Sequence, residues 1–177
     1  MKKILVSFAA VLFAAIMTTT VFTSCGGDDN DNTGGGSSAA AAAGMKVKYY
    51  VKFDSQSTFD ANDVTVEYTD ANGKTQTQTL TSLTEFSPDP VTLKGVPNKA
   101  EMKVSIVPKD NFTEGNYDVQ FSFGIGAVAV DAQGRETGTI KITPEYISHT
   151  AIRAEKKRTI TRTKTVSISS DGSINVN

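Results

Sequence analysis

The chain is poor in the residues that support the commonest protein chemistries. Its 177 residues include one Cys, one His and no Trp. One Cys cannot form an intramolecular disulfide, and one Cys with one His supplies too few ligands for an ordinary zinc site. An excess of charge is also lacking, since 18 Lys and Arg stand against 19 Asp and Glu. A broad nucleic-acid-binding surface is therefore not expected.

The sequence also lacks an apolar run long enough to cross a bilayer. Lys2 and Lys3 precede a mostly apolar stretch, residues 4–17, which ends at three threonines. A membrane-spanning helix needs roughly 20 apolar residues. A shorter run behind a positive start is typical of a secretory signal, and we expect residues 1–24 to be a signal peptide.

Small residues stand directly before the only cysteine, in the order Thr23-Ser24-Cys25. This pattern resembles the lipobox of bacterial lipoproteins of the Bacteroidota type, although Phe22 occupies the position where the common form has Leu. The resemblance implies cleavage before Cys25, lipidation of that residue and anchoring to the membrane. The alternative is an ordinary secretory signal followed by an incidental cysteine.

An acidic stretch follows the cysteine and contains Asp28, Asp29 and Asp31. It resembles the stretch that routes many Bacteroidota lipoproteins to the cell surface, which implies outer-membrane attachment facing the exterior. The alternative is a soluble spacer of disordered composition. Because residues 25–44 are rich in Gly, Ser and Ala, we expect them to form a flexible tether.

Residues 45–177 read as one domain built from strands. Residues 45–54 alternate apolar and polar side chains, which predicts a strand with one buried face. Similar patterns, separated by turn residues, predict an all-β antiparallel sandwich of about seven to nine strands. Its architecture is expected to be immunoglobulin-like, without the Cys and Trp signature of true immunoglobulin domains. The further predicted strands are 63–69, 74–81, 91–93, 101–107, 117–125 with its continuation 127–130, 138–143, 158–169 and 173–176.

Two segments of this domain leave local structure open. Gly124 and Gly126 predict a bend or bulge before residues 127–130. Residues 144–157 fit either a short helix with Pro144 at its first position or a strand with a basic end. We favour an irregular or short helical connection there.

The residues give no pattern for catalysis. A serine nucleophile would have to use His149, and no nucleophile-elbow motif is present. Acidic residues in loops form a hydrolytic pair only if the fold brings them together. We therefore expect a protein that is not an enzyme and carries no cofactor.

Calcium is the one metal that the sequence leaves open. Asp54, Asp60 and Asp63 lie between two predicted strands, and calcium takes oxygen ligands. Their spacing does not match an EF-hand loop, and Asp is also a common turn residue.

A basic cluster near the C-terminus is the main candidate for ligand contact. Arg153, Lys156, Lys157 and Arg158 form a patch with Arg162 and Lys164 farther along, offset nearby only by Glu155. They suit phosphate, lipopolysaccharide or an acidic glycan. Alternatively, charges at strand ends discourage pairing between sheet edges.

Three aromatic residues are further contact candidates. Tyr50 lies on the lysine-bearing face of the first strand, and Phe112 and Tyr117 flank a loop. We expect a lipid-anchored domain that binds a glycan, an envelope protein or a host protein. The alternatives are a structural accessory that packs against an envelope complex through a sheet edge, and a small hydrolase.

Overall fold

The computed structural model describes residues 41–177. No helix in this range is long and apolar enough to cross a bilayer. The predictions that concern the signal peptide, Cys25 and the acidic stretch Asp28, Asp29 and Asp31 lie outside the described residues. The elements are β1 (Gly44–Phe53), α1 (Ser57–Ala61), β2 (Asn62–Thr69), β3 (Thr75–Leu80), β4 (Val91–Lys94), β5 (Asn98–Pro108), β6 (Asn116–Val130), β7 (Glu145–Arg153), the 3₁₀ turn η1 (Ala154–Lys156), β8 (Ile160–Ile168) and β9 (Ile174–Val176).

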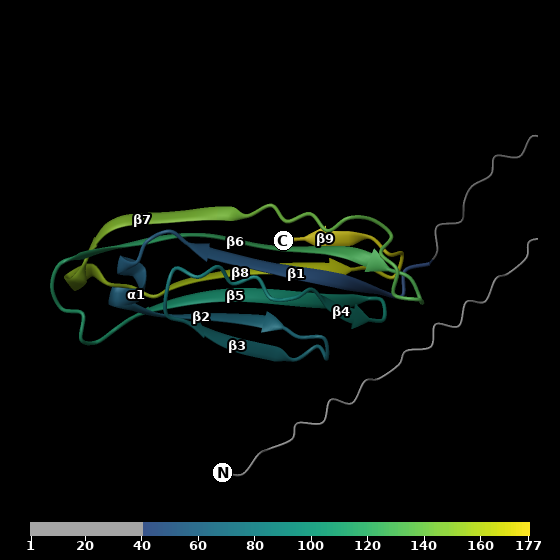
Figure 1. Cartoon of the computed structure of the whole chain (residues 1–177), viewed down its shortest axis with the longest axis horizontal. Coiled ribbons are helices and arrows are strands. Elements are labelled where there is room, and N and C mark those ends of the chain that lie inside the picture. The colour runs from purple at the N-terminus through teal and green to yellow at the C-terminus, as the bar shows by residue number, and fades with distance from the viewer. Residues whose placement is uncertain (1–40) are drawn as a thin grey trace, which may run out of the picture. The chain divides into compact units, whose positions relative to one another are not determined.

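The nine strands form two antiparallel sheets (Figure 1). One sheet has the order β4-β1-β6-β7 and the other has the order β3-β2-β5-β8-β9. This arrangement confirms the predicted all-β sandwich and its expected number of strands. Both sheets bring together strands that are distant in sequence. The edge strands are β4 and β7 in the first sheet, and β3 and β9 in the second.

The core follows the predicted alternation. Met45, Val47, Tyr49, Val51 and Phe53 of β1 are all between 0 and 1 % exposed. Aromatic rings fill much of the space between the sheets, and the ring of Phe53 lies 5.0 Å from that of Phe121. The Tyr49 hydroxyl donates a hydrogen bond of 2.8 Å to the carbonyl of Thr69, which satisfies a polar group that the fold buries.

The prediction of a bulge at Gly124 and Gly126 is wrong. Strand β6 runs through both glycines in unbroken register with β1, and its irregularity lies instead between Tyr117 and Val119, against β7. The glycines have a different role. A Cβ atom on Gly124 would lie 2.6 Å from Cγ2 of Ile142, and one on Gly126 would overlap the carbonyl oxygen of Lys141. They allow a chain segment to approach the strand closely.

The strand predicted at residues 138–143 is also absent. Gly124 pairs with Tyr50 of β1, between the inward-facing Phe123 and Ile125, so a Cβ there would point to the outer face of the sheet. The segment containing Ile142 therefore crosses that outer face instead of extending the sheet sideways. A segment above a sheet cannot join its ladder, because ladder hydrogen bonds lie in the plane of the strands.

Most of residues 144–157 form a strand, β7, which corrects the favoured irregular or helical connection. Strand β7 pairs with β6 from Glu145, opposite Phe123, to Arg153, opposite Asn116. The free edge of β6 decides the conformation, since it satisfies the backbone groups of a neighbouring extended chain. Only η1 is helical in this stretch. The short helix α1 was not predicted; it lies within the first expected loop.

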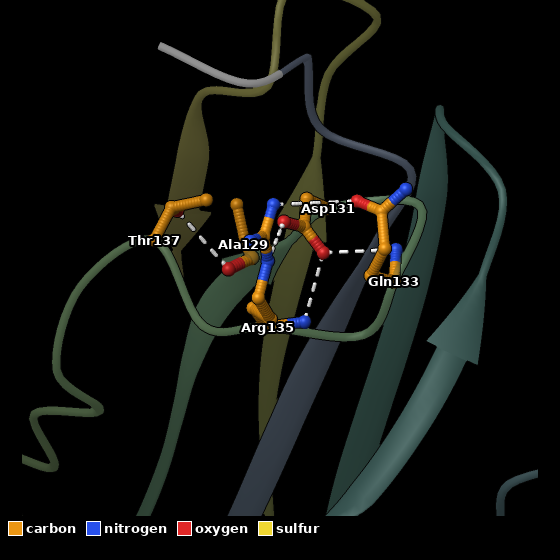
Figure 2. A network of polar contacts seen from close by, with 5 residues as sticks. All are labelled: Ala129, Asp131, Gln133, Arg135 and Thr137. Carbon is orange, nitrogen blue, oxygen red and sulfur yellow. Dashed lines mark hydrogen bonds and ion pairs between the residues drawn. The ribbon is translucent and has the colours of Figure 1, made fainter. Parts of the chain in front are cut away.

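The loop after β6 is closed by a compact polar network (Figure 2). The buried Asp131 carboxylate accepts hydrogen bonds of 2.9 Å from the backbone N–H groups of Gln133 and Arg135. It also accepts one of 2.6 Å from Nε of Arg135, while Thr137 donates to the carbonyl of Ala129. These bonds hold the pKa of Asp131 below its usual value, the backbone N–H of Arg135 having the largest effect. The hydrogen-bonding groups of the Asp131 carboxylate are thus occupied by partners within its own turn.

The first described residues lie at one end of the sandwich, and the basic residues at the end of β7 lie at the other. Next to the start of β1, the N–H of Ala43 bonds to the carbonyl of Val130, and its own carbonyl accepts from Gly95. The last residue of β7, Arg153, pairs with the first residue of β6. In Figure 1, α1 and the end of β7 lie at the left and the start of β1 lies at the right. Ten strand residues, the length of β1, span roughly 33 Å.

Candidate anion-binding surface

Strands β7 and β8 border the same open side of the sandwich. β7 is the last strand of its sheet, and β9 pairs with β8 only from Val166 to Ile168. An ion pair joins the two sheets here, because Nζ of Lys164 on β8 lies 2.9 Å from Oε2 of Glu145 on β7. The same ammonium group lies 5.3 Å from the centre of the Phe123 ring. Polar contacts therefore help to join the two sheets on this side.

Basic side chains, including the imidazole of His149, occupy inner-face positions along this side. On β8, Arg162 and Lys164 continue the alternation of the buried residues Ile160 and Val166, so they face the same way. On β7, His149 pairs with the buried Val119 and faces inward too. Inward-pointing charges blunt a sheet edge against unwanted pairing, and they also leave the mouth of the sandwich polar.

Two adjoining hollows lie on this side and meet at one arginine. The first has a volume of about 360 Å³ and is lined in part by Arg153, Lys156 and Arg158. The second has a volume of about 420 Å³ and is lined in part by His149, Arg158 and Arg162. We call these five residues the Arg158 surface.

The Arg158 surface keeps most of its positive charge. Within residues 41–177, Arg153 pairs with Glu155 at 3.7 Å, whereas no ion pair within 4 Å is formed by Lys156, Arg158 or Arg162. The pKa of His149 lies below its ordinary value, first because of partial burial and then because of the charges of Arg158 and Arg162. Guanidinium groups without a carboxylate partner are well suited to bind an external anion.

The structure brings together four of the six predicted cations, with Arg162 lining the second hollow and Lys164 paired with Glu145. Arg153, Lys156 and Arg158 line the hollows, whereas Nζ of Lys157 donates to the carbonyl of Lys109 and lines neither. Sequence reasoning did not connect His149 with this cluster. Its pairing with β6 is what places the imidazole beside the arginines of β8, and no motif in the sequence signals that pairing.

The aromatic candidates lie elsewhere. Tyr50 is half-buried on the outer face of β1 and lines neither hollow. Tyr117 is only 2 % exposed, so the prediction of an exposed contact at this residue is wrong. Its ring packs edge-on against Phe112, which is itself half-buried against the core. The pair closes the core at the start of β6.

The three acidic residues proposed for calcium do not form a cluster. In the described part of the chain, no group of three or more His, Cys, Asp or Glu side chains can hold a metal ion. Asp60 belongs to α1, and Asp63 is already part of β2, while Asp54 follows β1. The unpredicted helix separates residues that a simple loop would have allowed to converge, and no calcium site is assigned.

No family model, curated protein or solved structure significantly matches this chain.

Proposed function

We propose that the chain is a surface lipoprotein whose β-sandwich binds an anionic glycan without chemical conversion. The observation that carries this proposal is the Arg158 surface. Its cations line two adjoining hollows, and Arg158 and Arg162 have no acidic partner within 4 Å in residues 41–177.

The shape of the surface favours a repeating anion over a single small one. Two hollows that share Arg158 offer consecutive positions for sulfate, phosphate or carboxylate groups along one chain. Guanidinium groups bind such oxyanions through paired hydrogen bonds. Thr159 and Thr161 also line the second hollow, and their hydroxyls can bond to sugar hydroxyls.

The placement of the surface supports a ligand outside the anchoring membrane. The described chain begins beside Val130 and Gly95, at the end opposite Arg153 and η1. With a lipid on Cys25, as the sequence predicts, this geometry favours presentation of the cations away from the anchor. The basic residues are then better placed for an exterior polymer than for the headgroups of the anchoring membrane.

Binding without chemistry is favoured by the residues at the surface. Arginine does not release its proton near neutral pH, and the carboxylate of Glu145 is paired with Lys164. The carboxylate of Glu155 is likewise paired, with Arg153, and general acid–base hydrolysis of glycosides ordinarily requires a pair of carboxyl groups that face the scissile bond.

Heparin, a sulfated polysaccharide, is a suitable probe for the test. We expect the full chain to be retained on immobilised heparin and released by salt. The double variant R158A/R162A should bind more weakly by roughly tenfold or more, because each charge-assisted hydrogen bond contributes about 1.5–3 kcal/mol.

A matched control distinguishes this surface from net charge alone. The variant K52A/K74A also removes two positive charges, at exposed positions outside both hollows, and should bind heparin almost as tightly as the unmodified chain. Equal weakening by the two double variants, or no retention of the unmodified chain, would contradict the proposal.

A further inference from the structure

Strand β3, at the opposite edge of its sheet from β9, is exposed along nearly all of its length. β3 is an edge strand, and its residues Gln76 and Gln78 pair with Tyr68 and Val66 of β2. Val66 is fully buried, so Gln78 shares the inner face of the sheet, yet Gln76 and Gln78 are both exposed. An inner-face position that is exposed and carries an amide borders a water-filled space and not the core.

A cleft of about 480 Å³ occupies that space, between β3 and residues 81–88. The half-buried rings of Tyr68 and Phe86 line it, with centres 5.3 Å apart. Both rings are held in place. Phe86 exchanges backbone hydrogen bonds of 2.8 and 2.9 Å with Val51, and Tyr68 packs against Tyr49 at 5.4 Å. The aromatic surface is therefore preformed.

The remaining lining is rich in groups that donate and accept hydrogen bonds. Gln78 contributes an amide, and several serines and threonines contribute hydroxyls. Glu85 is the one charged residue among those that line the cleft, and it is exposed. The cleft thus combines an apolar ring surface with uncharged polar groups and one negative charge, in contrast to the Arg158 surface.

We propose that this cleft binds a neutral saccharide. A sugar ring presents apolar C–H groups that can pack on aromatic rings, and hydroxyls that can bond to amide, hydroxyl and carboxylate groups. A cleft of this volume, with aromatic residues and a few convergent polar groups, suits a small ligand. Glu85 accepts hydrogen bonds from hydroxyls and repels anions, which excludes the acidic polymers that the Arg158 surface favours. The site is separate from that surface and lies at the opposite edge in the strand order.

Titration of the ¹⁵N-labelled full chain tests this assignment. The probes are cellopentaose, maltopentaose, xylopentaose and mannopentaose, each added alone and followed by amide chemical shifts. At least one should shift the amides of Gln78, Thr79 and Phe86 saturably. The variant Q78A/E85A should weaken that binding by roughly tenfold, since it removes two exposed polar partners and leaves the packed rings in place. The matched variant T75A/T77A removes two exposed polar side chains of the same strand on the opposite face of the sheet, outside the cleft, and should leave the affinity within about twofold.

Three results would overturn the assignment. The first is that none of the four sugars moves the cleft amides. The second is a binding curve that Q78A/E85A leaves unchanged. The third is concentration-dependent broadening along β3 without sugar, which would mark the strand as an interface between two copies of the chain. Because these probes are neutral, the result does not depend on whether the chain binds heparin.

Discussion

At the scale of single residues, His149 reports on the field of the surrounding arginines. It is the only histidine in the chain, so its imidazole signals need no assignment among several candidates. Burial and the charges of Arg158 and Arg162 disfavour its protonated form. A bound anion would favour that form. Binding of an anion and protonation of His149 should therefore favour each other.

We predict that the His149 pKa in the free chain lies below 6.5, as measured by NMR titration of the imidazole. Because the folded state then binds fewer protons than the unfolded state, the free energy of unfolding should fall as pH decreases from about 6.5 through the folded pKa. Saturating heparin should raise the pKa, and heparin affinity should increase over the same fall in pH.

The arginine substitutions provide the control for this prediction. R158A/R162A should raise the His149 pKa, because it removes the two positive charges that lower it. K52A/K74A should leave the pKa near its original value, since neither lysine contributes to the shift. If R158A/R162A also leaves the pKa unchanged, the imidazole is not under the influence of these arginines.

At the scale of elements, the crossing of residues 138–144 over β6 depends on two glycines. The contact at Gly126 is with a backbone carbonyl, which cannot rotate away, whereas the nearest atom at Gly124 belongs to the Ile142 side chain. The two positions therefore differ in how far the structure can adapt to an added methyl group.

We predict that G126A lowers the free energy of unfolding by roughly 1–3 kcal/mol, as expected for overpacking, and that G124A has a smaller effect. Urea denaturation followed by circular dichroism measures both. Gly138 supplies the control, since an added Cβ would meet Val128 at an ordinary 3.5 Å. If G138A is as destabilising as G126A, the close approach of residues 138–144 to β6 does not explain why glycine is needed at positions 124 and 126.

Much of the element structure was predictable from alternation, and two of the failures share one cause. The alternating residues of β1 and β5 are buried as expected, with Met102, Val104 and Ile106 at 0 % exposure. Residues 138–143 carry a strand-like pattern without a free edge to pair with, whereas residues 145–153 have an ambiguous pattern and the open edge of β6 beside them. The local sequence pattern does not show which strand edges are free to pair with another strand.

At the scale of the whole molecule, the position of the cations relative to the start of the sandwich links binding to attachment. The Arg158 surface and the first described residues lie at opposite ends of the sandwich. An N-terminal lipid would then leave the surface free for an exterior polymer.

We predict that Cys25→Ala abolishes incorporation of a fatty-acid analogue in cells, because the thiol is the acceptor that the lipobox resemblance implies. In-gel detection of the labelled chain measures this. The soluble C25A chain should retain its affinity for heparin, since Cys25 precedes the sandwich. Labelling that persists in C25A would mean that no lipid is attached at this cysteine.

The sequence alone determined the fold class, because period-two alternation and turn residues are local properties that survive in any arrangement of strands. It also determined that Arg153, Lys156 and Arg158 would lie near one another, since they are close in the chain. The sequence also placed Arg162 in the same basic patch, whereas only the tertiary structure decided that His149 completes this surface and that Tyr68 and Phe86 line a cleft. Those contacts depend on strand order and on where each sheet ends, and both are set by packing over long sequence separations.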